Sequence, residues 1–133
     1  MKDLVWNKTL SVEVDEIDED HRRLVDLFNI LNHAVADGDP PDYQEAVLEE
    51  LICCTVWHFR HEERLMLKYA YEEFEEHKSE HRNLIESAKE LQQKFLQADR
   101  QIANNDFEFL EHWLTEHILV ADMKLGAYLA EVM

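Results

Sequence analysis

Residues 58–81, HFRHEERLMLKYAYEEFEEHKSEH, decide the fold of this chain. The stretch contains two pairs of potential metal ligands, His58 with Glu62 and His77 with His81, each at a spacing of four. Four residues make slightly more than one turn of an α-helix, so both members of each pair leave the same face. The pattern therefore predicts two helices that each present potential metal ligands on one face.

Apolar residues at a 3-4 spacing extend the helical pattern on both sides of this stretch. We expect helices at about residues 18–37, 42–67, 72–97 and 104–130, after an N-terminal arm at 1–17 that Trp6 anchors on the body. The chain has only two Gly and two Pro, which indicates few loops. Short connections make neighbouring helices antiparallel. The prediction for residues 1–133 is therefore one all-α domain, an antiparallel up-down-up-down four-helix bundle with an N-terminal arm.

Potential metal ligands occur in all four predicted helices, and a bundle can bring them to one interior point. The candidates are His21, His58, Glu62, His77, His81, His117 and Asp122. A scatter of surface residues could produce one such pair among eight His, but two pairs on apolar faces are harder to obtain by chance. Five imidazoles and two carboxylates are too many for one ion and favour a pair of transition metals, with iron the best match. Cysteine-rich structural zinc sites are excluded because the chain has only two Cys. The metalloprotease pattern His-Glu-x-x-His is also absent, since residues 77–81 read HKSEH.

His117 and Asp122 are five residues apart, which on an ideal helix turns their side chains roughly 140° out of line. Asp122 can then reach the site only from the helix edge or through a local π-type bulge, a feature common at functional sites. His112 competes with Asp122 for this role, and we favour Asp122. We place His33 and His61 off the metal-facing rows, and we expect His61 to be solvated.

The net charge and the cysteine content limit the partners and the cellular compartment that the protein can have. The net charge is −17, from 13 Lys+Arg against 30 Asp+Glu, which argues against nucleic acid and anionic membranes as partners. Cys53 and Cys54 are adjacent, so a disulfide between them would be strained, and we expect buried free thiols of a reducing compartment. Cys54 lies one turn before His58 and is an alternative metal ligand. We see no apolar leader and no membrane span, and we expect a cytoplasmic monomer.

Several segments together resemble the hemerythrin family, specifically single-domain bacterial hemerythrins. They are residues 17–24 (IDEDHRRL), 58–63 (HFRHEE) with Met66, Tyr71, 77–81 (HKSEH), and 113–118 (WLTEHI) leading to Asp122. The resemblance covers nearly the whole chain and includes Trp6 in the arm. Two departures are visible: Glu72 stands where relatives commonly have Pro, and Glu13 stands where they often have Gly. The first affects loop rigidity, and the second leaves the path of the arm open.

The resemblance implies a non-haem di-iron centre with an oxo or hydroxo bridge. It assigns His77, His81 and His117 to one iron, His21 and His58 to the other, and Glu62 and Asp122 to both as bridges. The second iron would keep an open position for O2.

The implied function is reversible O2 binding, for storage, transport or delivery to an oxygen-consuming enzyme, rather than catalysis. Apolar residues flank the ligands, and we expect Trp113, Leu114 and Ile118 to line the O2 pocket, with Trp57 and Phe59 as further walls. Ferritin-like di-iron enzymes use Glu-x-x-His pairs, and this chain has no Glu three residues before any His. Two rival functions stay open: a di-iron enzyme acting on peroxide or nitric oxide, and an O2-sensing module read by a partner protein.

Overall fold

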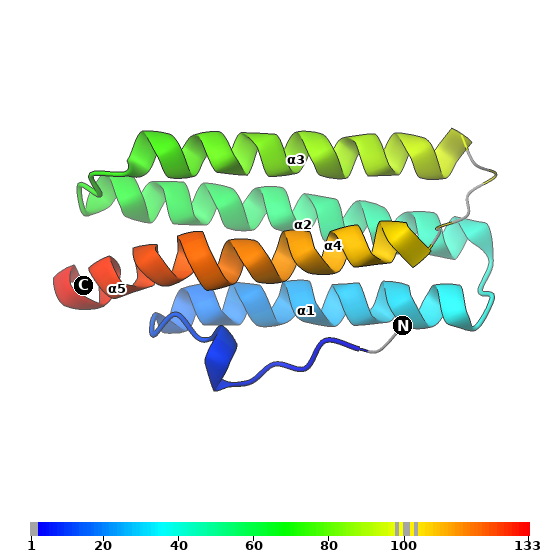
Figure 1. Ribbon diagram of the computed structural model, residues 1–133, viewed down its shortest axis with the longest axis horizontal. Coiled ribbons are helices and arrows are strands. Elements are labelled where there is room, and N and C mark those ends of the chain that lie inside the picture. The colour runs from blue at the N-terminus through cyan, green and yellow to red at the C-terminus, as the bar shows by residue number, and fades with distance from the viewer. Residues whose placement is uncertain (1–2, 98, 100–101, 103) are drawn as a thin grey trace.

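Four antiparallel helical rods form the molecule, and an N-terminal arm lies against them (Figure 1). The computed structural model describes residues 3–97, 99, 102 and 104–133, except the side chains of residues 104 and 107. The elements are η1 (Lys8–Leu10) in the arm, α1 (Asp15–Ala36), α2 (Pro41–Lys68), α3 (Phe74–Gln97), α4 (Asn104–His117), the π-helix η2 (Ile118–Asp122) and α5 (Met123–Val132). The last three follow one another along a single rod. The predicted all-α bundle is confirmed, and the described residues contain no strand.

The first connection between helices is short because its residues stop one helix and start the next. Gly38 has a φ of +67° just after α1, a left-handed conformation that costs glycine little. Pro41 is the first residue of α2, where its missing N–H has no intrahelical partner to lose. The helix α1 starts at Asp15, three residues before the expected start, with Asp15, Glu16 and Asp18 in its first turn. Carboxylates are stabilising there because the helix dipole is positive at the N-terminus.

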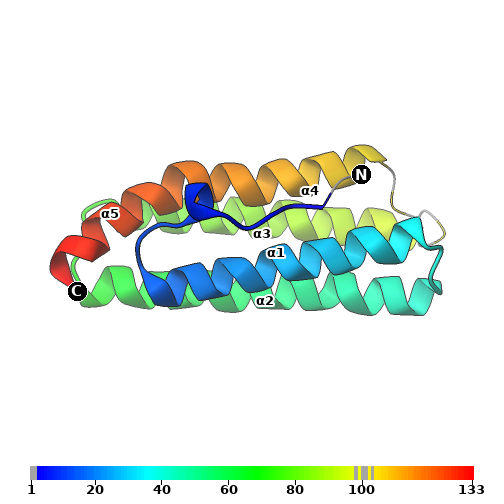
Figure 2. The same ribbon diagram turned by 90° about the horizontal axis from the view of Figure 1, so that it is seen from below.

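The arm is fixed by hydrogen bonds and close packing on both sides. The carboxylate of Asp18 accepts from the Ser11 hydroxyl at 2.6 Å and from the Val12 N–H at 2.8 Å. A β-carbon on Gly126 of α5 would lie 2.2 Å from the carbonyl oxygen of Val12, so only glycine allows this approach. Trp6 is half-buried against the core, and the Arg22 guanidinium lies 5.2 Å from its ring. The arm thus runs along α1 and the rod of α4 (Figure 2).

Glu13 carries backbone strain where the arm turns into α1. Its φ of +66° lies in the left-handed region, which costs a residue with a β-carbon roughly 1 kcal/mol. We expect Glu13→Gly to raise the free energy of unfolding by up to about 1 kcal/mol, because the relieved strain exceeds the added entropy of the unfolded chain. Urea unfolding measures this. Glu90→Gly in the regular turns of α3 is the control, with an expected loss of about 1 kcal/mol. A loss of stability in Glu13→Gly would contradict the prediction.

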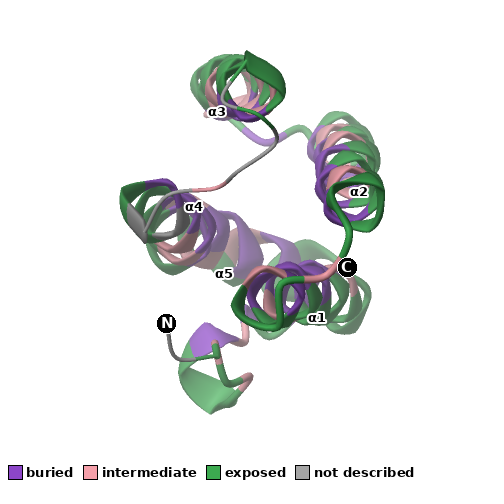
Figure 3. Ribbon diagram, turned by 90° about the vertical axis from the view of Figure 1, so that its right-hand side faces the viewer, coloured by how far each residue is buried: buried purple, intermediate pink, exposed green. Residues whose placement is uncertain are grey.

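The buried faces of all rods point to the centre of the bundle (Figure 3). Leu24 and Leu31 of α1 and Leu48 of α2 are fully buried in the apolar core, as are Leu125 and Leu129 of α5. Among the described helices, none is both long enough and apolar enough to cross a membrane. The core contains a buried polar cluster toward the end of the bundle where α1 and α3 begin and α2 ends. An apolar interior tolerates such groups only when they find partners.

Candidate metal centre

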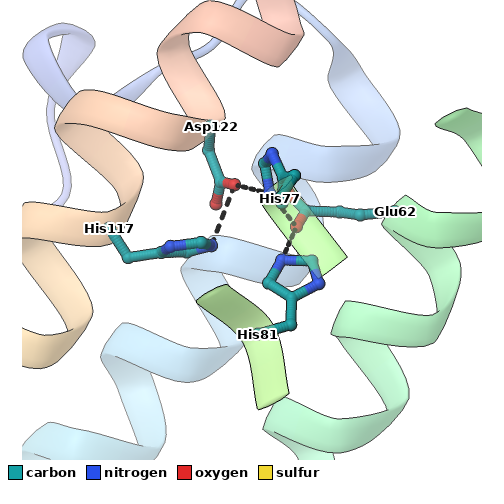
Figure 4. A group of neighbouring side chains, drawn as sticks. All are labelled: Glu62, His77, His81, His117 and Asp122. Carbon is teal, nitrogen blue, oxygen red and sulfur yellow. Dashed lines mark ion pairs between the residues drawn. The ribbon is translucent and has the colours of Figure 1, made fainter. Parts of the chain in front are cut away.

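All seven residues predicted as metal ligands lie together inside the bundle. Each has an exposed fraction of 5% or less: His21, His58, Glu62, His77, His81, His117 and Asp122. Figure 4 shows five of them, contributed by α2, α3 and the last rod, with their ring nitrogens and carboxylate oxygens pointing toward one another. The i, i+4 spacing in α2 and α3 aims these side chains inward, as the sequence predicted.

The two carboxylates divide their oxygens between two groups of histidines. The Oε1 atom of Glu62 lies 2.9 Å from His81 Nε2 and 3.5 Å from His77 Nε2, whereas its Oε2 atom lies 3.3 Å from His58 Nε2. Among the described residues, three sets of side chains could hold a metal ion, and Glu62 and Asp122 belong to the two that are fully buried; the third, Asp20, His58 and His61, is only partly buried. One buried set adds His77, His81 and His117 to Glu62 and Asp122, and the other adds His21 and His58.

Asp122 repeats this division from the opposite side. Its Oδ1 atom lies 3.1 Å from both His77 Nε2 and His117 Nε2, and its Oδ2 atom lies 2.8 Å from His21 Nε2. A carboxylate that presents one oxygen to each of two neighbouring sites has the arrangement of a bridging ligand.

A π-helical turn gives Asp122 its direction. The segment η2 covers Ile118–Asp122, immediately after His117. Its wider turn brings residues five apart onto nearly the same face, which an α-helix does only for residues four apart. The expected π-type bulge is therefore present, whereas the competing His112 is exposed at the surface.

Carboxylates outside the cluster fix the orientation of three of its imidazoles. The Nδ1 atoms of His58, His81 and His117 lie 2.9 Å from Asp20, 3.1 Å from Glu63 and 2.8 Å from Glu80, respectively. A carboxylate on Nδ1 leaves Nε2 free to bind a metal and raises its basicity. The sequence reasoning missed these three acids. Each is the neighbour in sequence of one cluster residue but contacts another cluster residue on a different helix.

Ten buried side-chain atoms of the cluster lack a hydrogen bond of good geometry, and all belong to these seven residues. They include both oxygens of Glu62 and Asp122 and the Nε2 atoms of all five histidines. Buried polar atoms without partners are costly, and such concentration at one point is unusual. A pair of metal ions would satisfy these atoms together, so the donor set fits a metal centre.

The charges of the cluster attract cations. Burial alone would lower the pKa of His58, but Glu62 and Asp20 raise it to about 10. Burial likewise opposes the charge on His117, yet Asp122 raises its pKa to about 10. Burial also opposes the charge on Glu62, but His58 and its neighbouring imidazoles hold the pKa of Glu62 well below its usual range. The carboxylates thus stay ionised and favour positive charge beside them.

A small cavity of about 10 Å³ opens beside His21 and His58, with room for about one water-sized molecule. The predicted pocket residues Trp113, Leu114 and Ile118 all line it. Its other lining residues outside the cluster are Leu24, Thr55 and Phe59. The sequence did not single out Leu24 and Thr55 as cavity residues, because many other residues on the buried faces of α1 and α2 have the same helical spacing.

Some expectations outside the cluster were wrong. His61 is half-buried rather than solvated, because Asp20 and Glu16 hold its two ring nitrogens at 2.6 Å and 3.1 Å. Trp57 is 55% exposed and lines no part of the cavity, since it points away from the core face of α2. The cysteines are not buried: Cys53 is exposed and Cys54 half-buried.

Cys54 and His33 both lie outside the cluster. Cys54 belongs to neither group of cluster residues that could hold a metal ion, so the structure does not bring it to the site. His33 contacts Asp3 of the arm at 2.7 Å, at the opposite end of α1 from His21.

Comparison with known proteins places the chain among proteins with this fold. Residues 12–129 match the family model of the hemerythrin HHE cation-binding domain. Bacteriohemerythrin from Methylococcus capsulatus is 32% identical over 85% of this chain and 86% of that protein, and that from Pseudomonas paraeruginosa is 33% identical over 89% and 76%. A crystal structure of wild-type hemerythrin is 30% identical with a TM-score of 0.86, covering 96% of this chain and 98% of that one. The chain therefore belongs to the hemerythrin family.

Proposed function

We propose that this protein binds two iron ions with its seven-residue cluster and binds O2 reversibly at the cavity beside His21 and His58. The single observation that carries the proposal is the division of the oxygens of Glu62 and Asp122 between two groups of histidines. When bound, the iron pair supplies the electrons and the open coordination position that O2 binding requires. The protein then serves as an oxygen carrier that stores, transports or delivers O2 rather than consuming it. The free thiols of Cys53 and Cys54 fit work in a reducing cytoplasm.

The two groups of histidines would have unequal tasks. His77, His81 and His117 would fill the coordination of one iron together with the shared carboxylates, and His21 and His58 would leave the other iron incomplete. The cavity supports this assignment, because both His21 and His58 line it, whereas His117 is the only member of the three-histidine group that does, and its walls outside the cluster are largely apolar. An incomplete site that faces an apolar cavity can accept a small neutral molecule.

The walls of the cavity favour a carrier over an enzyme. Among the described lining residues outside the cluster, Thr55 is the only polar one, and its hydroxyl donates to the Leu51 carbonyl at 2.7 Å. The Trp113 indole N–H donates outward to the Leu84 carbonyl at 3.0 Å, which leaves its ring against the cavity. No described lining side chain outside the cluster is thus placed to donate a proton for cleavage of the O–O bond, and the apolar walls disfavour the escape of a charged product.

Iron analysis with optical spectroscopy tests the proposal. The purified protein is expected to hold about two irons per chain, as its two overlapping donor sets require. The reduced, colourless sample is expected to gain a visible absorption band in O2 and to lose it when O2 is removed, over repeated cycles. A protein that binds a single iron, or one whose spectrum does not change reversibly with O2, would refute the proposal.

A further inference from the structure

A basic groove lies on the outer face between α2 and α3, on a chain with a net charge of −17. Four of the 13 Lys and Arg residues line it: Arg60 from α2, and Lys78, Arg82 and Lys89 from α3. The carboxylates in its walls are Glu63 and Glu86, so the lining carries a net positive charge. Such an excess is unexpected by chance where acidic residues outnumber basic ones by more than two to one. The lining of the groove thus carries a local charge opposite in sign to that of the whole chain.

The cations of the groove are available to a ligand. Among described residues, the ion pairs of Lys and Arg involve Arg22, Lys94 and Lys124, none of which lines the groove. Arg60, Arg82 and Lys89 are exposed. Lys78 is half-buried, with its ammonium 5.5 Å from the Phe74 ring. Unpaired guanidinium groups on two facing helices can bind an anionic group with paired hydrogen bonds from both sides.

The floor of the groove is apolar. Val56 and Phe59 of α2 and Ile85 of α3 form it, and the volume of about 360 Å³ lies within the range of small-molecule sites. The Phe59 ring stacks on the His81 ring with centroids 3.8 Å apart and an angle of 4° between the planes. Phe59 also lines the buried cavity, and His81 of the seven-residue cluster lines the groove itself, so the groove adjoins the candidate metal centre.

We propose that this groove binds a small organic anion with an apolar body, held by Arg60 and Arg82 at its charged end and by Val56, Phe59 and Ile85 along its body. The charged end is either a phosphate ester or a carboxylate, since both accept paired hydrogen bonds from arginine. The groove opens on the outer face of the bundle and shares one lining residue, His81, with the seven-residue cluster. Its occupation does not depend on the O2 chemistry proposed above. The occupant lies next to Glu63, whose carboxylate accepts a hydrogen bond from the His81 imidazole at 3.1 Å.

Calorimetric titration of the iron-loaded protein at low salt tests the site with three probes. Phenyl phosphate and hexanoate each combine an anion with an apolar body, and inorganic phosphate lacks the body. At least one of the first two is expected to bind one to one with a Kd below about 1 mM, and inorganic phosphate at least about tenfold more weakly. Binding of phenyl phosphate alone identifies a phosphate ester, and binding of hexanoate alone identifies a carboxylate. Failure of both, or equal binding of inorganic phosphate, overturns the proposal.

Charge reversal locates the bound probe. Arg82→Glu is expected to weaken binding at least about tenfold, because it replaces an attractive charge by a repulsive one. Arg23→Glu, in an exposed position on α1 outside the groove, changes the net charge equally and is expected to leave the Kd unchanged. Iron content and circular dichroism verify that both variants are folded. If Arg82→Glu binds the probe as tightly as Arg23→Glu does, the groove is not the site.

Discussion

Replacement of Glu62 by Gln is expected to remove both irons rather than one. The side chain keeps its size, but one of its oxygens becomes an amide nitrogen that cannot bind a metal cation. Because the two oxygens of Glu62 face different histidine groups, a single substitution affects both proposed ion sites. Loss of an outer hydrogen-bond partner typically lowers metal affinity by roughly 10- to 100-fold, so loss of a shared ligand is expected to cost more than about 100-fold. Iron per chain after gel filtration measures the loss.

Two further variants separate this effect from loss of charge. Glu49→Gln removes the same charge from an exposed position on the same helix and is expected to retain both irons. Glu63→Gln removes the carboxylate that accepts from His81 Nδ1, and we expect weaker binding of one iron only. Should Glu62→Gln retain two irons per chain, the shared position of this carboxylate would have no role in metal binding.

The inward-facing candidate ligands were predictable because their spacing follows directly from helix geometry. His58 and Glu62, or His77 and His81, share a face on any α-helix. Asp122 was predictable for a different reason: its spacing from His117 is wrong for an α-helix, so a ligand role required the π-helical turn that η2 supplies. These predictions needed only the local conformation of one rod at a time.

Contacts that depend on two rods at once were not predictable in the same way. Asp20 follows the helical pattern of α1, yet its carboxylate binds His58 and His61 of α2. The outcome depends on the rotation of the two helices about their axes and on rotamers, neither of which a single helix pattern specifies. The same dependence explains why His61, which was expected in solvent, is held between two carboxylates. It also explains why the division of carboxylate oxygens became visible only in three dimensions.

The sequence also could not predict a backbone conformation that the residue at that position disfavours. Glu13 adopts a positive φ although its β-carbon disfavours it, because Asp18 and Gly126 fix the arm on either side of Val12. The absence of the expected glycine left the path of the arm open, and packing against α5 determines that path. Tertiary contacts override local preference here at a cost of roughly 1 kcal/mol.

Removal of iron is expected to lower the melting temperature by more than about 10 °C. Ions that bind only the folded state, at about 1,000 times their Kd, contribute about 4 kcal/mol per site, and each kcal/mol shifts the melting temperature by several degrees in a domain of this size. The iron-free protein still buries two carboxylates among five imidazoles. Without the metal ions, less favourable interaction energy offsets the cost of removing these carboxylates from water. Calorimetry of the loaded and chelator-treated protein measures the difference.

The melting temperature of the iron-free protein is further expected to fall as the pH rises from 7 to 10. The pKa of His58 and of His117 is raised from 6.5 to about 10, and that of His77 to about 9, against the opposing effect of burial. A raised folded-state pKa contributes stability that is complete below about pH 6.5 and is lost as the pH rises through 9 to 10. Iron requires these imidazoles without their Nε2 protons, so the loaded protein does not lose this contribution, and the gap between the two forms widens with pH.

Asp122→Asn tests whether the cluster causes this pH dependence. Asp122 is among the groups that raise the pKa of His77 and of His117, so its neutral counterpart is expected to flatten the decline in the iron-free protein. The exposed pair of His33 and Asp3 is present in every form and cancels in the comparison. Two results would mean that protons do not occupy the cluster in place of metal. One is a difference in melting temperature between the loaded and iron-free protein that stays constant from pH 7 to 10. The other is a fall in the melting temperature of the iron-free protein that persists unchanged in Asp122→Asn.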